Sequence, residues 1–349
     1  MTTTKQSSFW PSSWATSLFS LFLAGITLAV ATSLATRPKA ITTNNDNIKK
    51  KNGQQPRKTI RIAFLGNSIQ YFNDCPRLLE RMFQADGGYD GVYQNSCLRG
   101  GASIISLFKK GNGMEEKFHT DNALLPDGSY DIGAPTVKDL LLEKDFDFAV
   151  INDHTQSPAR QESREKTVET LKKDYVPLLV QSSGSSITTP IFIQTAAYRK
   201  EEIRGTSDLG DFDHYTQLLQ DGYQYYRTKV DAAIQEQQKP ESPQSTTRIA
   251  PVGLAYSHIY HPDKALWERL YHRDDFHPSP HGTLLQAYIL FITMTEREPP
   301  TIYNTTWWNR ARRMQPPSEE PLPIPTLAEA KELRQIAIQV CQSNNLIDA

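Results

Sequence analysis

Apolar residues occur in short runs, separated by polar and glycine-rich stretches, from about residue 59 onward. The first run, residues 60–65, is rich in strand-favouring side chains and stops at Gly66, as a buried parallel strand does. The same reasoning predicts four more strands, at residues 91–95, 146–151, 191–195 and 247–252.

Longer amphipathic or apolar stretches lie between these predicted strands and after the last of them, and predict helices. We expect helices at residues 76–83, 168–180, 215–235, 262–271 and 283–297. Strands that alternate with helices have connections long enough for parallel pairing. The pattern therefore predicts a three-layer α/β/α fold, in which helices pack on both faces of a mainly parallel sheet.

The C-terminal part of the chain predicts one more helix. Thr326 and Glu329 have the spacing of a capping box. The apolar positions that follow share one helical face: Ala330, Leu333, Ala337 and Val340. We expect this helix, at residues 326–345, to pack on a main domain at residues 59–300. The segment between them, residues 301–325, is aromatic, basic and then rich in proline, and is expected to be exposed.

Residues 14–35 contain no charged side chain and are long enough to cross a bilayer as one helix. They follow a polar segment at residues 1–13. Two interpretations stay open: an uncleaved membrane anchor, which suits the length, or a signal peptide, which would explain the small residues near Ala35. Residues 36–58 are polar and without periodicity, and predict a disordered stem.

Composition narrows the range of partners. The 349 residues carry a formal net charge of −1, and no basic stripe with interleaved aromatic residues occurs, so no nucleic-acid partner is expected. Asn304 begins the sequon Asn-Thr-Thr, a glycosylation acceptor of exported proteins. Basic residues are more frequent after the apolar segment than before it, which opposes export. Because of the sequon we still expect a lumenal or extracellular main domain, held by the membrane anchor or secreted after cleavage.

Polar residues that can do chemistry follow several of the predicted strands. Ser68 lies just after the first strand, Gly100 and Gly101 after the second, and Asn152 after the third. In open α/β sheets the reactive groups gather at the carboxyl ends of the strands. Each of these residues alone is also compatible with an ordinary turn or helix cap.

A loop between the last two predicted helices of the main domain holds an acid and an imidazole at close spacing. Asp274 precedes His277 by three residues, and prolines at positions 278 and 280 stiffen the loop. This spacing lets a carboxylate orient an imidazole, as the base of a serine nucleophile requires. Asp275 is the reserve candidate for the acid, and an acidic surface turn is the alternative interpretation.

Together these four segments resemble the four sequence blocks of the SGNH (GDSL-like) hydrolase superfamily. The resemblance covers about residues 59–299, and the blocks read Gly66-Asn67-Ser68, Gly100-Gly101, Val150-Ile151-Asn152-Asp153 and Asp274-Asp275-Phe276-His277. The chain departs from the common pattern twice: Asn67 replaces an aspartate, and Val150 replaces a frequent glycine. The first departure indicates a subfamily with Gly-Asn-Ser in its first block.

The resemblance implies a flavodoxin-like sheet and a role for each matching residue. Ser68 is implied as the nucleophile, His277 as its general base and Asp274 as the group that orients the base. The backbone N–H groups of Ser68 and Gly101, together with the side-chain amide of Asn152, are implied as the oxyanion hole.

The implied activity is hydrolysis of an ester through an acyl-serine intermediate, with an O-acyl group such as O-acetyl on a carbohydrate as the expected substrate. An O-acyltransferase with the same triad and a binding protein that has lost turnover stay open as alternatives. The family mechanism uses no cofactor or metal, and none is expected. The spaced histidine pairs lack the further ligands of a metal site: His258 with His261, and His277 with His281.

Two further features stay undecided from sequence. Cys75 and Cys97 follow the first two strands and could form a disulfide in an exported protein, while Cys341 is the third cysteine. Residues 109–136 and 198–213 are longer than ordinary connections, and are either loops near a site or surface insertions.

Overall fold

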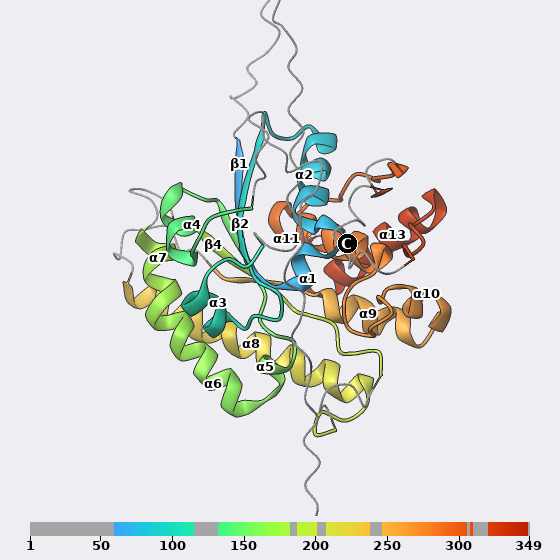
Figure 1. Ribbon diagram of the computed structural model, residues 1–349. Helices are drawn as coiled ribbons and strands as arrows, with labels where there is room; N and C mark the ends of the chain where they lie inside the picture. Colours follow the sequence, from blue (N-terminus) through green and yellow to red (C-terminus); the bar gives the residue numbers. More distant parts are fainter. Residues whose placement is uncertain are drawn as a thin grey trace, which may run out of the picture. The chain divides into compact units, whose positions relative to one another are not determined.

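The computed structural model describes residues 59–349 except 115–131, 182–186, 201–206, 238–245, 306–307, 310–319 and 348–349. Its centre is a five-stranded sheet in the order β2-β1-β3-β4-β5, in which every neighbouring pair is parallel (Figure 1). The strands are β1 (Ile60–Gly66), β2 (Val92–Leu98), β3 (Phe148–Ile151), β4 (Thr189–Ile193) and β5 (Arg248–Ala250). The predicted α/β fold with a mainly parallel sheet is confirmed, and the strand order is the flavodoxin-like one.

The inner strands are mostly apolar because helices cover both of their faces. In β1 every residue except Arg61 is buried. The edge strand β2 is mostly half-buried, so it tolerates polar side chains in its middle. For this reason the apolar pattern predicted a strand that stopped at residue 95, whereas β2 continues to Leu98.

One face of the sheet is covered by α2 and α11, and α13 packs on the outer side of α11 (Figure 1). Ser279 caps α11 by accepting hydrogen bonds from the backbone N–H groups of His281 and Gly282, and every residue of α11 from Pro280 to Met294 is buried. The helices on this side are α2 (Cys75–Asp86), α9 (Val252–Tyr260), α10 (Lys264–Arg269), α11 (Pro280–Thr295) and α13 (Leu327–Ser343).

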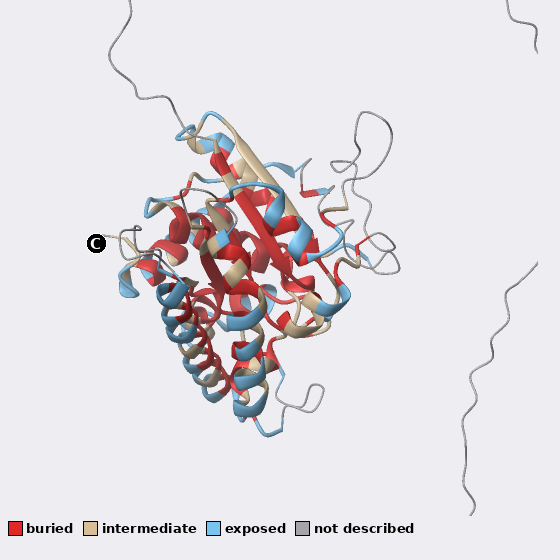
Figure 2. Cartoon of the chain, turned by 90° about the vertical axis from the view of Figure 1, so that its left-hand side faces the viewer, coloured by how far each residue is buried: buried red, intermediate tan, exposed pale blue. Residues whose placement is uncertain are grey.

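The opposite face is covered by α4 and α8, with further helices packed against them. The helices of this layer are α3 (Ile104–Lys110), α4 (Val137–Glu143), α5 (Gln156–Ala159), α6 (Gln161–Thr170), α7 (Val176–Gln181) and α8 (Phe212–Gln237). Buried residues fill the sheet and the inner faces of both helix layers, while exposed residues lie on the outer faces (Figure 2). The three predicted layers are therefore present.

The five predicted helices of the main domain are present, with ends that differ from the prediction. The helix predicted at residues 168–180 begins earlier, as α6, and continues through a π-helical turn at Leu171–Tyr175 into α7. In α6 only Thr167 and Val168 are buried, so its polar sequence gave no periodic signal. The helix predicted at 262–271 is the shorter α10, which Asp263 caps.

The sequence pattern missed α9 altogether, because its apolar residues follow β5 almost directly. The strand predicted to reach residue 252 ends at Ala250, and α9 begins at Val252. Pro251 lies between them. A short apolar run does not distinguish a strand from the first turn of a buried helix.

The predicted C-terminal helix is present as α13. Thr326 and Glu329 form the complete capping box. The four apolar positions that were predicted to face the domain are buried, and α13 packs against α11 and α9.

The cysteines do not form the disulfide that the sequence left open. Cys75, Cys97 and Cys341 are free and buried, and burial raises the pKa of each thiol to about 12. Cys75 begins α2 and contacts Gln286 of α11, on one side of the sheet. Cys97 belongs to β2 itself, in register with Leu65 of β1.

Several predictions concern residues that the structure does not describe. The apolar segment at 14–35 and the stem at 36–58 lie outside the described residues. Among the residues that the structure does describe, no helix has the length and apolar character needed to cross a membrane. Asn304 is exposed, and Thr306, the last residue of its sequon, is outside the described part.

Candidate active site

Ser68 lies at the point where the sheet changes its direction of winding. It follows β1, whose two neighbours β2 and β3 lie on opposite sides of it. Asn67 caps the short helix α1 (Ser68–Tyr71) by accepting a hydrogen bond from the backbone N–H of Ile69. In sheets of this strand order the space beyond β1 and β3 is where ligands bind.

Ser68, His277 and Asp274 form one hydrogen-bonded chain, as predicted from their sequence blocks. His277 Nε2 lies 2.6 Å from Ser68 Oγ, and His277 Nδ1 lies 2.6 Å from Asp274 Oδ2. A carboxylate can only accept, so Nδ1 carries the proton and donates a hydrogen bond to Asp274. Nε2 is then the acceptor for the Ser68 hydroxyl, which is the arrangement that a general base needs.

The loop that carries His277 is held by local contacts. Asp274 Oδ1 accepts hydrogen bonds from the backbone N–H groups of Phe276 and His277, at 3.2 and 3.0 Å. The imidazole of His277 stacks on the ring of Phe72, with 3.9 Å between ring centroids. These contacts fix the plane of the imidazole.

Asp274 stays ionised in this environment. Burial opposes its charge, but hydrogen bonds from His272 and His277 outweigh that effect and hold the pKa of Asp274 well below its usual range. His272 Nδ1 lies 3.3 Å from the same carboxylate oxygen that His277 contacts. The carboxylate therefore faces two imidazoles.

Asp275, the reserve candidate for the acid, points to different partners. Its Oδ1 pairs with the Arg199 guanidinium, and its Oδ2 lies 2.6 Å from Lys200 Nζ. Asp275 also has a φ of 69°, in the left-handed region of backbone conformation. The structure thus brings Asp274, and not Asp275, to His277.

The two residues whose backbone N–H groups are expected at the oxyanion hole, Ser68 and Gly101, lie at the same cavity. Gly101 has a φ of 67°, a conformation that glycine adopts without strain. Ser68 and Gly101 both line one cavity with His277. Within the part of the chain that the structure describes, the backbone N–H groups of these two residues have no protein hydrogen-bond partner.

The side chain of Asn152, the third donor expected at the oxyanion hole, makes its described hydrogen bonds to other protein groups. Its Nδ2 donates to Asn67 Oδ1 at 2.8 Å and to the Asp153 carbonyl at 3.1 Å. Its Oδ1 accepts from the backbone N–H of Asn67 and from Gln70 Nε2. Asn152 is fully buried and does not belong to the described lining of the cavity. The described hydrogen bonds of the Asn152 amide therefore hold the turn that contains Asn67 and Ser68.

This network explains two residues of the Gly66-Asn67-Ser68 block. A Cβ atom on Gly66 would lie 1.9 Å from Asn152 Oδ1, so only glycine fits above the amide. Asn67 Nδ2 donates to the carbonyls of Ala102 and Asp153, at 2.8 and 3.2 Å. An aspartate could not make these two bonds, since a carboxylate has no donor. The asparagine in place of the common aspartate therefore matches its surroundings.

Asp153 ties three parts of this region together. Its buried carboxylate accepts hydrogen bonds from the backbone N–H groups of Ile104 and His154 at 2.9 and 2.8 Å. The other oxygen accepts from the hydroxyls of Thr167 and Tyr226. Burial raises the pKa of Asp153, and these four donors act in the opposite direction. The first turn of α3, just after Gly101, is thereby fixed to the end of β3.

The cavity at Ser68 is small, with a volume of about 230 Å³. Sequence patterns did not identify most of its other lining residues, namely Tyr71, His154, Thr155, Tyr198 and Phe276. Burial raises the pKa of Tyr71 to about 12, against a smaller opposite effect of a hydrogen bond with Ser68, so its phenol is neutral. The only available signal was position: four of these residues lie in or close to the four blocks in sequence, and Tyr198 is the first residue of the second insertion.

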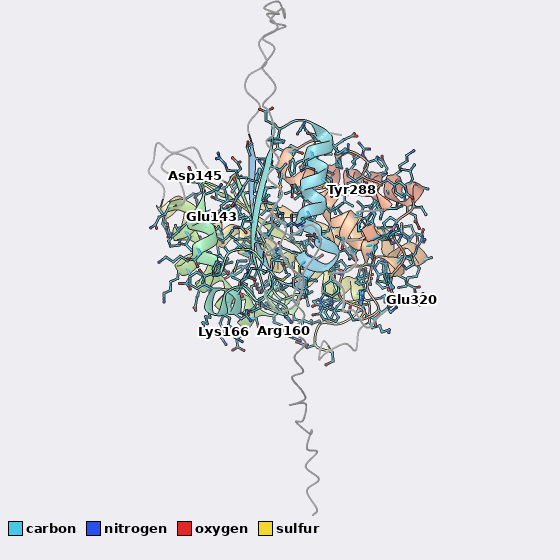
Figure 3. The ribbon with its side chains drawn as sticks, turned by 45° about the horizontal axis from the view of Figure 1, so that its top comes forward. Glu143, Asp145, Arg160, Lys166, Tyr288 and Glu320 are labelled. Carbon is cyan, nitrogen blue, oxygen red and sulfur yellow. The ribbon has the colours of Figure 1, made fainter. Side chains whose placement is uncertain are left out.

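The insertion at residues 198–213 is one of the loops beside this cavity, so far as its described residues show. Tyr198 lines the cavity, and Arg199 holds the loop of His277. Farther along, Asp208 makes two hydrogen bonds with Arg160, which lies at the edge of the molecule (Figure 3). Of the two interpretations left open from sequence, the loop near a site is the one that these contacts match.

Comparisons with known proteins support the fold. No protein-family model and no curated protein matches the chain. A DUF4886 family protein from Bacteroides uniformis has a similar structure, with a TM-score of 0.51 and 15% identity over 83% of this chain and 97% of its own. Weaker likenesses include a candidate SGNH hydrolase from Slackia heliotrinireducens (TM-score 0.44, 20% identity, 68% of this chain and 100% of its own). Another is the acetyl xylan esterase AlAXEase (TM-score 0.39, 16% identity, 66% and 98%).

A second cavity, of about 350 Å³, lies beside β5 and α8. It is larger than the one at Ser68, but the described residues that line it include no serine, cysteine or histidine. The described residues contain no cluster of three or more metal-ligating side chains. Of these two cavities, the one at Ser68 is therefore the one that brings together the candidate nucleophile, the candidate base and the expected backbone donors.

Proposed function

We propose that this protein is a serine hydrolase of the SGNH type that cleaves an ester through an acyl-serine intermediate. The observation that carries this proposal is the chain from Ser68 through His277 to Asp274, with both hydrogen bonds at 2.6 Å. Serine is a weak nucleophile on its own and needs an adjacent, oriented base. His277 provides that base, and it lies with Ser68 at the edge of a cavity.

In the proposed reaction His277 Nε2 takes the proton of Ser68 while Oγ attacks the carbonyl carbon. The negative charge that develops on the carbonyl oxygen is stabilised by the N–H groups of Ser68 and Gly101. His277 then gives its proton to the leaving alcohol, and the acyl group stays on Ser68. A water molecule, activated by the same imidazole, releases the acid and restores the hydroxyl.

We propose a small acyl group, such as acetyl, on a carbohydrate as the substrate. Pockets for drug-sized ligands usually measure about 300 to 1,000 Å³, and the cavity at Ser68 is smaller, at about 230 Å³. Three aromatic side chains, Tyr71, Tyr198 and Phe276, narrow it. This size favours a short acyl chain, with the alcohol part extending outward.

The proposed location follows from the sequon and the apolar segment. We propose a lumenal or extracellular catalytic domain, with residues 14–35 as anchor or cleaved signal and a glycan on Asn304. Expression in a secretory cell, followed by endoglycosidase treatment, should lower the apparent mass of the protein. An unshifted band from a cytosolic protein would exclude this location.

The proposed activity is tested most directly with a fluorophosphonate probe and a panel of p-nitrophenyl esters. The wild-type protein should be labelled and should hydrolyse acetate faster than butyrate or octanoate, whereas Ser68→Ala should do neither. No labelling of the folded wild-type protein would contradict the proposal. Product analysis with and without an acceptor sugar separates the two chemistries: free acetate in both cases identifies the hydrolase, and acyl transfer to the sugar identifies a transferase.

A further inference from the structure

The second cavity, beside β5 and α8, contains polar side chains that the proposed mechanism does not use. Its described lining shares no residue with the cavity at Ser68. Five carboxamide side chains line it: Gln194, Gln220, Gln224, Asn344 and Asn345. A carboxamide has both hydrogen-bond donors and an acceptor. The cavity therefore offers both kinds of partner to a ligand.

Two buried side chains at this cavity each have a polar atom without a partner. Gln194 is 1% exposed and Thr247 is 0% exposed. Within the part of the chain that the structure describes, neither Gln194 Nε2 nor Thr247 Oγ1 has a hydrogen-bond partner. Buried polar groups in native proteins are nearly always hydrogen-bonded. A ligand that brings an acceptor to Gln194 and a hydroxyl to Thr247 would satisfy both groups.

The positions of these side chains indicate an elongated ligand. The Gln194 backbone N–H donates to the Ala250 carbonyl, and Thr247 precedes Ala250 by three residues. Because an extended chain rises about 3.3 Å per residue, about 10 Å separates the two levels along β5. On α8, Gln220 and Arg227 line the cavity from one helical face, seven residues and again about 10 Å apart. A small anion is too short to contact both ends of such a cavity.

The arginines at this cavity already face groups that neutralise or bind them. Arg248 Nη2 lies 2.8 Å from Glu296 Oε1, and its Nη1 donates to the Thr293 carbonyl at 2.7 Å. Arg227 faces the carboxylate of Asp231, with 3.8 Å between Nε and Oδ2. These charges balance, so the cavity does not favour a charged ligand. Neutral hydroxyl groups, which both donate and accept, match its carboxamides.

We propose that this cavity binds a neutral oligosaccharide. A chain of linked sugar units is elongated and carries hydroxyl groups along its length. The cavity volume of about 350 Å³ lies within the usual range for small-molecule sites, about 300 to 1,000 Å³. This binding activity goes beyond the proposed esterase function and does not depend on it, because the two cavities share no described lining residue.

Isothermal titration calorimetry tests the proposal with four neutral probes that carry no ester: maltotriose, cellotriose, xylotriose and triacetylchitotriose. At least one should bind the full-length wild-type protein with a dissociation constant of about 1 mM or lower. Ser68→Ala should bind the same probe equally well, so the measurement holds whether or not the protein is an esterase. If none of the four binds, the proposal is wrong.

An anionic probe of similar length tests the chemical class. Trigalacturonate should bind no more tightly than the best neutral probe, because the arginines of the cavity already face carboxylates. Binding of trigalacturonate more than about tenfold tighter, a difference of about 1.4 kcal/mol, would overturn the assignment of a neutral ligand.

Two substitutions locate the site. Gln194→Leu and Thr247→Val remove the polar groups without a partner and keep a similar size. Each should weaken binding about 3- to 10-fold, as the loss of one hydrogen bond does. Gln217→Leu, at an exposed position of α8 outside the described lining, is the matched control and should bind as the wild type does. Unchanged affinity in both cavity variants would place the sugar elsewhere and overturn the assignment.

Thermal unfolding separates binding from folding. Because Gln194 Nε2 and Thr247 Oγ1 have no described partner, their apolar replacements should leave the unfolding midpoint of the sugar-free protein unchanged or higher. The sugar should raise the midpoint of the wild type, and this rise should shrink in both variants. A lower midpoint in both sugar-free variants would show that the two groups are bound within the protein, which would remove the basis of the proposal.

Discussion

The two halves of the candidate site are held in place by different kinds of interaction. On the nucleophile side, Asn67, Asn152 and Asp153 are fully or almost fully buried and bonded to one another and to the backbone at the ends of β1 and β3. On the base side, Asp274 and His277 lie on a half-buried loop, positioned by charges and by stacking on Phe72. The polar residues of the nucleophile side are buried in the core, whereas Asp274 and His277 on the base side are only half-buried.

This difference predicts how each half responds to substitution. A buried polar network is stable only when every member is satisfied, so changes on the nucleophile side should affect folding as well as activity. The side chains of Asp274 and His277 are themselves only half-buried, although their neighbours in the loop are buried. Changes there should lower activity while leaving the free energy of unfolding nearly unchanged.

The largest expected loss of activity comes from substitutions of Ser68 and His277, one residue from each half of the site. Ser68→Ala and His277→Ala should each lower kcat by about 10⁶-fold, and the double variant should lose no more than either single one. The reason is that each residue is useless in the absence of the other. Steady-state kinetics with a chromogenic acetate ester measures this. Losses that multiply in the double variant would show that the two residues act independently.

The next effect concerns the base side alone. Asp274→Asn should lower kcat by about 10⁴-fold, because an amide can donate to His277 Nδ1 and so select the wrong tautomer. Asp275→Asn is its matched control and should keep most of the activity, since Asp275 pairs with Arg199 and Lys200. Both variants should unfold at urea concentrations near that of the wild type. Equal loss of kcat in the two would refute the assignment of Asp274 as the orienting acid.

On the nucleophile side a single change of amide to carboxylate should damage the fold. Asn67→Asp would place a charge against the carbonyl oxygens of Ala102 and Asp153, and should cost about 3 to 5 kcal/mol of unfolding free energy at pH 7. Burial and these oxygens would raise the pKa of the new carboxyl group. The native state would then bind a proton that the unfolded state does not, so the loss should shrink as the pH falls toward 5.

The control for this comparison is Asn345→Asp, at an exposed position with a φ of 56° that aspartate also tolerates. Urea unfolding at pH 7 and pH 5 measures all three proteins. A normally stable Asn67→Asp protein would mean that the donor bonds of Asn67 contribute nothing to the fold.

The smallest expected effect is a gain of stability on the same side. Burial raises the pKa of Asp74 to about 6, although Arg77 partly opposes this shift. The native state is therefore penalised as the pH rises from about 4 through 6, by roughly 2 to 3 kcal/mol in all. Asp74→Asn should stabilise the protein at pH 7, with asparagine well suited to the φ of 54°. The gain should vanish below about pH 4, and an equal gain at every pH would exclude ionisation as its cause.

The sequence predicted the parts of the site whose chemistry depends on residue type and short spacing. Asp274 and His277 are three residues apart, so their contact is nearly a local property of one loop. The carboxyl ends of parallel strands meet at one edge, so Ser68 and Gly101 could be expected there together. These positions follow from local patterns and from one rule of sheet architecture.

What the sequence could not predict depends on register and on the direction of side chains. Asn152 and His154 follow β3 and are two residues apart, yet of the two only His154 is among the described lining residues of the cavity, and no property of either residue alone reveals this. Tyr198 reaches the cavity from a long loop whose path has no periodic signal. The missed α9 and the polar α6 show the same limit, because burial there comes from tertiary packing alone.

The separation between Ser68 and His277 has a consequence for the time course of synthesis. The two residues that share a hydrogen bond are 209 positions apart in the chain. A ribosome that adds about 5 to 20 residues per second needs roughly 10 to 40 s to cover that interval. Throughout this time the nascent protein carries its serine without an imidazole to activate it. The enzyme we propose would therefore be inert while it is being made, and would become reactive only when the loop of His277 has left the ribosome and docked.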